Sequence, residues 1–142
     1  MIVRNIQTSD YLGVKRVGNR YAKDTLLGLL NDSQLDLIIK SCFEDGIVLI
    51  AEKDGDIVGV IGGKFVNGLP GGKMIEEVIW YVEPEHRGIG AVLFDSFLDA
   101  CKKASCVGLM MVAYNNDSFK FVERFYLRNG FKEIERRYYK EL

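Results

Sequence analysis

The chain has 142 residues, 48% of them hydrophobic and 27% charged, which is ordinary for a globular protein large enough to bury a core. Its 19 basic and 20 acidic residues nearly cancel, so nothing in the charge balance indicates nucleic-acid binding. No stretch approaches the about 20 apolar residues of a membrane span, and the N-terminus lacks the apolar core of a signal peptide. These properties predict a cytoplasmic protein without a nucleic-acid or membrane partner.

Side chains that commonly bind metals are few. The chain has one histidine, His86, and three cysteines, Cys42, Cys101 and Cys106, without C-x-x-C spacing. We therefore expect no metal site. All three cysteines are expected to be reduced thiols, two of them in or beside the core.

The first part of the chain reads as a strand followed by helices. The segment "IVRNI" favours a short strand, and Thr8–Asp10 offers N-cap candidates for a helix. Residues 11–43 follow a helical pattern that suits two helices, with a break at residues 31–34. Two apolar runs then flank Asp54-Gly55, a pair that tolerates the positive φ of a two-residue turn, and this predicts a β-hairpin.

Strands and helices alternate in the second part. Residues 73–82 predict a strand that Pro84 ends. A helix of about four turns follows, with an apolar stripe of Leu93, Phe94, Phe97, Leu98 and Cys101. The apolar run at 107–114 predicts a central strand covered on both faces. A last helix is expected to end at Asn129-Gly130, and residues 131–142 are expected to form a closing strand.

The predicted order is therefore β, two helices, β-hairpin, β, α, β, α, β. Neither a repeat nor a linker interrupts it. The sequence predicts one mixed α/β domain, α+β-like in character, over residues 1–142.

The stretch "VEPEHRGIG", residues 82–90, combines a strand end, a glycine turn and a helix start. A helix start offers unpaired N–H groups to an anion, and glycines let a phosphate approach the backbone. Gly88 and Gly90 would supply the turn, and Arg87 a charge-assisted contact. The stretch is neither a P-loop nor a dinucleotide fingerprint. From these residues alone, an anion site and a plain strand-to-helix turn are both open.

With its surroundings, this stretch resembles the GNAT superfamily of acyl-CoA N-acyltransferases. The likeness rests on V-x-P-x-x-R-G-x-G after an apolar strand and on "RFYLRNGF" downstream. It implies a GNAT fold, with a central, mixed, mostly antiparallel sheet flanked by about four helices. It also implies acetyl-CoA as acyl donor, whose pyrophosphate the family binds through [R/Q]-x-x-G-x-[G/A].

The family motif fits the chain in two registers. If Arg87 opens it, Gly90 fits but Val92 stands at a small-residue position. If Gly88 and Gly90 close it, Glu85 takes the Arg or Gln place and the loop is about two residues shorter; the helix stripe favours this register. The resemblance implies a cofactor site formed by Trp80, Tyr81, Val82, Arg87, Gly88, Ile89, Gly90, Ala91 and Asn115, although Asn115 equally suits a turn or cap.

The resemblance also suggests catalytic residues. Tyr126 occupies the place of the family's general acid, and a phenol with a pKa near 10 stays protonated at pH 7; the alternative is a core aromatic. Glu76 and Glu77 lie on the strand where the family often keeps a general base. Because side chains alternate along a strand, only one of the two can face the cleft, and either is open. His86 receives no role.

Together these features predict an enzyme that transfers an acetyl or short acyl group from acetyl-CoA to an amine by direct attack. The alternatives are a non-catalytic acyl-CoA-binding sensor or regulatory module and a domain that binds another phosphate ligand, such as a nucleotide. The acceptor is not indicated. Basic residues of the first helices would suit an acidic acceptor but are also typical of a solvated face: Lys15, Arg16, Arg20 and Lys23. Monomer and homodimer both stay open.

Overall fold

The computed structural model describes residues 1–25, 31–68 and 71–142 of the chain. These residues form two compact units, Met1–Val112 and Ala113–Leu142.

The first unit is built on a five-stranded sheet with the strand order β1-β2-β3-β4-β5. The strands are β1 (Ile2–Asn5), β2 (Gly46–Lys53), β3 (Asp56–Asn67), β4 (Lys73–Val82) and β5 (Gly108–Met110). The first four pair antiparallel, whereas β5 runs parallel to β4. The predicted mixed, mostly antiparallel sheet is confirmed.

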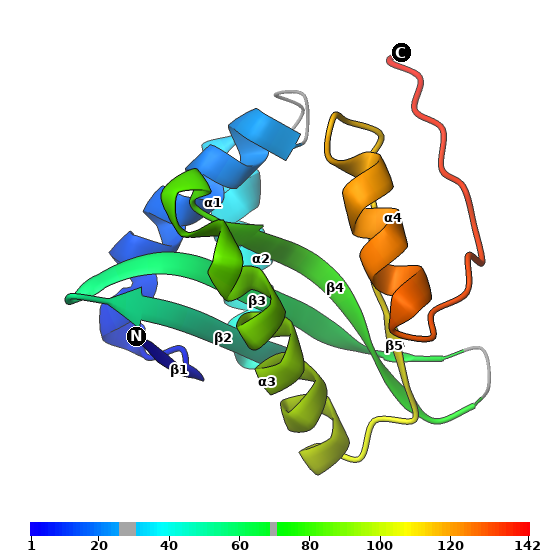
Figure 1. Ribbon diagram of the computed structural model, residues 1–142, viewed down its shortest axis with the longest axis horizontal. Coiled ribbons are helices and arrows are strands. Elements are labelled where there is room, and N and C mark those ends of the chain that lie inside the picture. Colours follow the sequence, from blue (N-terminus) through cyan, green and yellow to red (C-terminus); the bar gives the residue numbers. More distant parts are fainter. Residues whose placement is uncertain (26–30, 69–70) are drawn as a thin grey trace. The chain divides into compact units, whose positions relative to one another are not determined.

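Helices lie on both faces of this sheet. They are α1 (Tyr11–Thr25), α2 (Asp32–Glu44) and α3 (Gly90–Lys103), with short 3-10 helices η1 (Thr8–Asp10) and η2 (Pro84–Ile89). On β4, the ring of Trp80 packs on Phe94 of α3, whereas the ring of the next residue, Tyr81, packs on Tyr21 of α1. Because neighbouring side chains of a strand point to opposite faces, α1 and α3 cover opposite sides. Figure 1 shows α3 in front of the sheet and α2 behind it.

Each helix buries residues at helical spacing. In α3, Leu93, Phe94, Phe97 and Cys101 are buried as predicted, while Leu98 is half-buried. The start of α2 differs from expectation. The side chain of Asn31 accepts a hydrogen bond from the Gln34 N–H, so residues 32–34 form the first helical turn rather than a break.

The predicted hairpin is confirmed. β2 and β3 pair in antiparallel register up to Lys53 and Asp56, which leaves two residues in the turn. Asp54 has φ 53° and Gly55 has φ 85°. Two consecutive positive φ values match the twist of the strands, which is why a short polar residue followed by glycine is favoured there.

The cysteines lie as the sequence predicts. Cys42 of α2 and Cys101 of α3 are buried, and Cys106 is half-buried; all three are free thiols. Burial raises the pKa of both Cys42 and Cys101 to about 12, because a thiolate loses its solvation there. Both therefore stay neutral at pH 7.

Two predicted strands differ in the structure. Of residues 107–114, only Gly108–Met110 pair with β4; β5 is half-buried and stands last in the strand order, so its predicted length and central position are wrong within this unit. In the second unit, α4 (Phe119–Arg128) ends at Asn129-Gly130 as predicted, with Gly130 at φ 82°. Residues 131–142 form no strand within this unit, because a strand needs a pairing partner and α4 is its only helix or strand.

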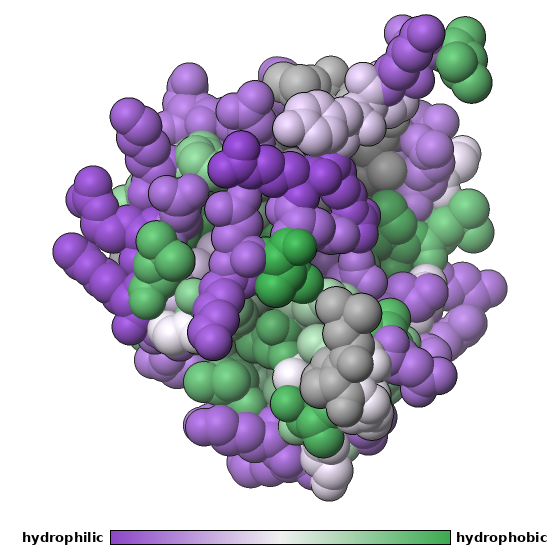
Figure 2. Space-filling view, turned by 90° about the vertical axis from the view of Figure 1, so that its right-hand side faces the viewer, coloured by the Kyte–Doolittle hydropathy of each residue, from purple (hydrophilic) through white to green (hydrophobic). Residues whose placement is uncertain are grey.

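The visible surface is mostly polar. Figure 2 shows hydrophilic residues over most of one face, with hydrophobic residues in separate patches. Among the described residues, every helix is too short or too polar to cross a membrane.

Candidate functional site

The connection from β4 to α3 is a pair of 3-10 turns, η2, with a break at His86, where φ is −127°. α3 begins at Gly90, whose N–H donates to the carbonyl of Arg87. Neither Gly88 nor Gly90 has a positive φ. A Cβ built at Gly88 would meet no atom of the described residues within 4 Å. Neither backbone conformation nor packing requires glycine at position 88, and the missing side chain leaves open space at the start of α3.

Arg87 lies at this turn and is exposed. Its guanidinium carbon is 5.8 Å from the centroid of the Tyr81 ring. Such a contact orients the cation on the ring face and uses none of the guanidinium N–H groups as donors. The turn therefore combines the guanidinium of Arg87, the start of α3, and Gly88, a glycine that neither backbone conformation nor packing requires.

Tyr81 links the turn to α1. Its hydroxyl donates to a carboxylate oxygen of Asp24 at 2.5 Å. Burial, and then the hydrogen bond to Asp24, raise the pKa of Tyr81 to about 12, so the phenol stays protonated at neutral pH. One side chain thus contacts both the last turn of α1 and Arg87.

A buried carboxylate also fastens the turn to α1. Glu83, which is 7% exposed, forms ion pairs with Arg16 and with Arg20, the latter at 3.2 Å. Arg16 also donates to the carbonyl of Ile57 at 2.6 Å. Arg20 lies 3.8 Å from the carboxylate of Glu85, the acidic residue that takes the Arg or Gln place in the favoured motif register. Arg20 therefore offsets negative charge at the turn.

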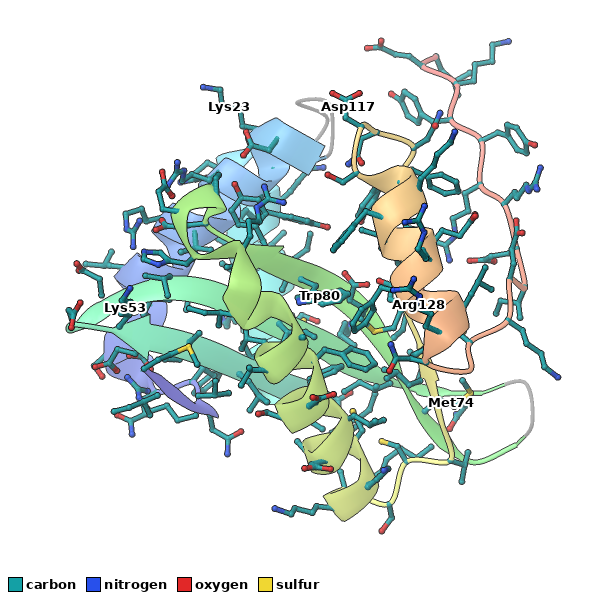
Figure 3. All side chains as sticks on the ribbon, viewed as in Figure 1. Lys23, Lys53, Met74, Trp80, Asp117 and Arg128 are labelled. Carbon is teal, nitrogen blue, oxygen red and sulfur yellow. The ribbon has the colours of Figure 1, made fainter. Side chains whose placement is uncertain are left out.

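The basic residues of α1 are thus largely engaged within the chain. Besides Arg16 and Arg20, Lys15 pairs with Asp32 at 3.0 Å and Asp36 at 3.1 Å. Lys23 extends outward from the end of α1 (Figure 3). These ion pairs favour the interpretation of a helix surface over that of an acceptor site.

The two glutamates of β4 have different surroundings. Glu76 is half-buried, whereas Glu77 is 5% exposed. A carboxylate oxygen of Glu77 accepts the backbone N–H of Val112 at 2.8 Å. The side chain of Glu77 therefore links β4 to the segment after β5.

The cofactor residues predicted on β4 pair with β3. Trp80, Tyr81 and Val82 lie opposite Ile61, Val60 and Gly59. On the other edge, the β5 ladder ends at Glu76, so these three residues lie beyond it. Figure 3 labels Trp80 on this part of β4, close to α3.

The other two candidates, Tyr126 and Asn115, belong to the second unit. Tyr126 is 8% exposed, and its ring centroid is 5.2 Å from that of Phe131. Asn115 is exposed. The neighbouring Asn116 accepts the Ser118 N–H at 3.0 Å, a hydrogen bond typical of a turn.

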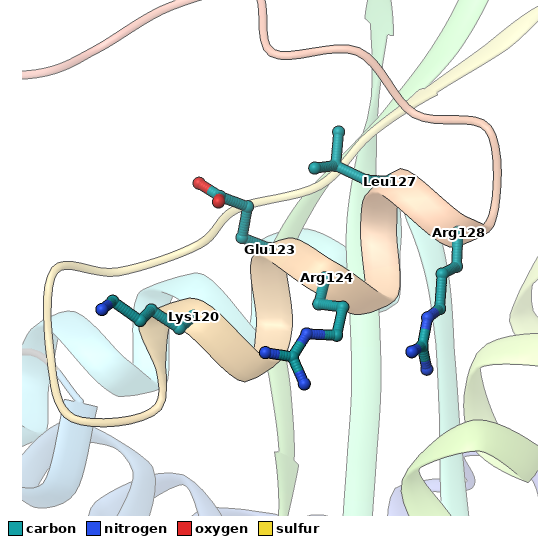
Figure 4. Close-up of a pocket in the computed structure, with 5 residues that line it drawn as sticks. All are labelled: Lys120, Glu123, Arg124, Leu127 and Arg128. Atoms are coloured by element: carbon teal, nitrogen blue, oxygen red, sulfur yellow. The ribbon is translucent and has the colours of Figure 1, made fainter.

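Two pockets lie elsewhere on the surface. The second unit has one of about 480 Å³, lined by α4 side chains: Lys120, Glu123, Arg124, Leu127 and Arg128. Figure 4 shows Arg124 and Arg128 on one side of the helix and Glu123 and Leu127 on the other. The first unit has one of about 280 Å³ beside η2, lined by Arg16, Lys53, Asp54, Asp56, Val58, Glu83 and His86. None of the predicted site residues lines either pocket.

Sequence reasoning missed the residues that support the turn. Glu83 directly precedes Pro84, and a carboxylate at a strand end would normally be solvated. Its partner Arg16 is 67 residues away in the sequence. No local signal identifies such a pair, because only the fold brings α1 to the end of β4.

Comparison with known proteins agrees with the fold. The model of the Acetyltransferase (GNAT) family matches residues 15–131. Similar solved structures include ribosomal-protein-alanine N-acetyltransferase from Brucella melitensis biovar Abortus 2308 (18% identity, TM-score 0.79, covering 99% of this chain and 98% of that chain). A possible acetyltransferase from Clostridium difficile 630 is 21% identical (TM-score 0.76, 99% and 97%). A predicted acetyltransferase with acetyl-CoA from Clostridium acetobutylicum is 18% identical (TM-score 0.76, 99% and 94%).

No curated protein matches the chain. The family match nevertheless spans most of its length, and the predicted strand–turn–helix motif lies inside the matched residues. This protein belongs to the GNAT acetyltransferase family.

Proposed function

We propose that this protein is an N-acetyltransferase that moves an acetyl or short acyl group from acetyl-CoA to an amine of a small molecule or protein. The observation that carries the proposal is the turn at Gly88. Glycine there serves neither a positive φ nor tight packing, whereas a phosphate that approaches the backbone needs the absence of a Cβ. Arg87 and the start of α3 add positive charge at the same place.

The residues present fit the donor. Arg87, Gly88, Ile89, Gly90 and Ala91 would hold its pyrophosphate. The backbone of Trp80, Tyr81 and Val82, with Asn115, would hold the pantetheine arm. When bound, acetyl-CoA would supply the acyl group as a reactive thioester.

The chain's own groups would provide the remaining chemistry for direct attack by the amine. A backbone N–H near Trp80–Val82 would stabilise negative charge on the carbonyl oxygen. The Tyr126 hydroxyl would hold the proton that a departing thiolate requires, and Glu76 or Glu77 would accept the amine proton, directly or through water.

Donor binding is tested at the turn with calorimetry. Gly88→Ala should weaken acetyl-CoA binding about tenfold or more, because the new methyl group occupies the phosphate approach; tenfold corresponds to about 1.4 kcal/mol. Arg87→Ala should also weaken it, whereas Lys103→Ala, the same charge change at the far end of α3, should not. ATP should compete poorly.

Equal affinity of the wild type and Gly88→Ala for acetyl-CoA would remove the basis of the proposal. ATP binding as tight as that of acetyl-CoA would instead favour a nucleotide site.

Turnover separates an enzyme from a binding module. With an acceptor found by screening amines, Tyr126→Phe should lower kcat about 100-fold or more, because it removes the donor hydroxyl, and leave acetyl-CoA affinity intact. Tyr138→Phe is the matched control, since Tyr138 is 91% exposed in the same unit. Unchanged kcat in Tyr126→Phe would exclude this tyrosine as the acid, and donor binding without any turnover would favour the sensor.

A further inference from the structure

The ladder between β4 and β5 is short and ends abruptly. Three residue pairs form it, Met74 with Gly108, Ile75 with Leu109 and Glu76 with Met110. The next residue of β4 is Glu77. In a continuous parallel ladder, backbone hydrogen bonds would extend past Glu77, but the last pair is Glu76 with Met110.

A side chain continues the connection where the backbone ladder ends. The Glu77 carboxylate accepts the N–H of Val112, two residues beyond the last paired residue of β5, at 2.8 Å. Glu77 is 5% exposed, so this charge-assisted bond lies out of water. A carboxylate side chain reaches farther than a backbone carbonyl, so it can span strands that have begun to separate.

The other edge of β4 is irregular at the same point. Gly62 of β3 lies opposite Ile79 and Gly63 lies opposite Glu77, so Val78 is an extra residue in a β-bulge. The hydroxyl of Tyr21 in α1 donates to the carbonyl of Val78 at 3.5 Å. Backbone pairing of β4 is therefore interrupted on both edges around Glu77 and Val78.

We propose that Glu77 is a positioning residue that holds the segment after β5 to β4 where the two strands part. The bond to the Val112 N–H fixes this residue beside the part of β4 that leads to Trp80–Val82, and thereby supports binding of the acyl-pantetheine arm. This second step rests on the proposed function. The inference also separates positioning from general-base catalysis, because holding the Val112 N–H needs only an acceptor oxygen, whereas a general base must also take up a proton.

The bond itself is tested by amide hydrogen exchange followed by NMR on the whole chain. The Val112 amide should be protected in the wild type. Glu77→Gln should preserve most of the protection, because the amide oxygen can still accept. Glu77→Ala should speed exchange about 10- to 100-fold. Glu76→Gln, the matched change one residue earlier, should leave it unaltered. Rapid exchange of Val112 in the wild type would overturn the proposal.

The effect on the site is tested with acetyl-CoA by calorimetry. Glu77→Gln and Glu76→Gln should bind as the wild type does, and Glu77→Ala should bind about tenfold more weakly. If Glu77→Ala does not fold, Glu77→Gln still tests the role of Glu77. If Glu77 were the general base, this variant would lose turnover and the acidic limb of the pH–rate profile, while the Val112 amide stayed protected and acetyl-CoA binding stayed intact. That result would overturn the positioning role.

Failure of the proposed function has a different signature. Without acetyl-CoA binding by the wild type, the arm-binding step falls together with the proposed function. Amide exchange of Val112 in Glu77→Gln and Glu77→Ala then still tests the hydrogen bond between Glu77 and Val112. Exchange that speeds up only in Glu77→Ala would support this bond, and equal exchange in both variants and the wild type would overturn it.

Discussion

At the scale of single residues, Asp10 illustrates how one carboxylate organises a chain terminus. Its oxygens accept two N–H groups of Arg4, at 2.7 and 2.9 Å, and the backbone N–H of Gln7 at 2.7 Å. Asp10 is 8% exposed. The hydrogen bonds from Arg4, followed by that from Gln7, hold the pKa of Asp10 below its usual value despite burial.

The lowered pKa of Asp10 predicts a pH-dependent contribution to stability. A carboxyl group whose pKa is lower in the folded state stabilises the fold above its unfolded pKa of about 3.9, and this stabilisation is lost as the pH falls through the folded pKa. Asp10→Asn should lower the free energy of unfolding by about 1–3 kcal/mol at pH 7. The difference from the wild type should shrink below about pH 4.

Urea unfolding from pH 7 to pH 3 measures this difference. Asp95→Asn serves as control, because Asp95 is exposed on α3, and it should stay close to the wild type throughout. A constant gap between Asp10→Asn and the wild type at every pH would contradict the assignment.

At the scale of elements, Gly55 and Gly88 both have room for a side chain but have different roles. A Cβ at either Gly55 or Gly88 would meet no atom of the described residues within 4 Å. Gly55 has φ 85° in the β2–β3 turn, whereas the φ of Gly88 is not positive. Because an added methyl group would meet no packing conflict at either position, substituting both glycines by alanine measures the cost of backbone conformation alone.

Gly55→Ala should lower the free energy of unfolding by about 1–2 kcal/mol, the cost of a left-handed conformation for an L-residue with a Cβ. Gly88→Ala should leave stability unchanged or raise it by about 0.4–1 kcal/mol, because alanine restricts the unfolded chain. Urea unfolding of both variants provides the comparison. Destabilisation by Gly88→Ala would show that this glycine serves the fold, and its loss of ligand affinity would then need another explanation.

Local patterns predicted most elements for reasons visible in the structure. The β2–β3 hairpin follows from a turn that accepts two positive φ values, and α3 follows from an apolar stripe that is buried along one face. The start of α2 was misplaced because Asn31 is a cap, and a polar capping segment looks like a break when its hydrogen bonds are unknown. β5 was predicted too long because an apolar run does not reveal where its ladder ends.

At the scale of the whole molecule, the sequence by itself determined the mixed α/β class, the hairpin, and the strand–turn–helix motif that contains Arg87 and Gly88. These depend on interactions within a few residues: periodic burial, turn conformation and capping. The family match is consistent with this, because it covers the same motif.

Only the tertiary structure decided what those residues contact. It pairs Glu83 with Arg16, which is 67 positions away in the sequence, and it brings the Tyr81 hydroxyl to Asp24, 57 positions away. It also brings the Glu77 carboxylate within hydrogen-bond distance of the Val112 N–H, 35 positions away. The sequence places none of these partners, because a buried carboxylate is stabilised by whichever donors the fold brings within hydrogen-bond distance. Whether Glu77 resembles a base or a structural link therefore depends on where β5 leaves β4, which is a property of the folded sheet.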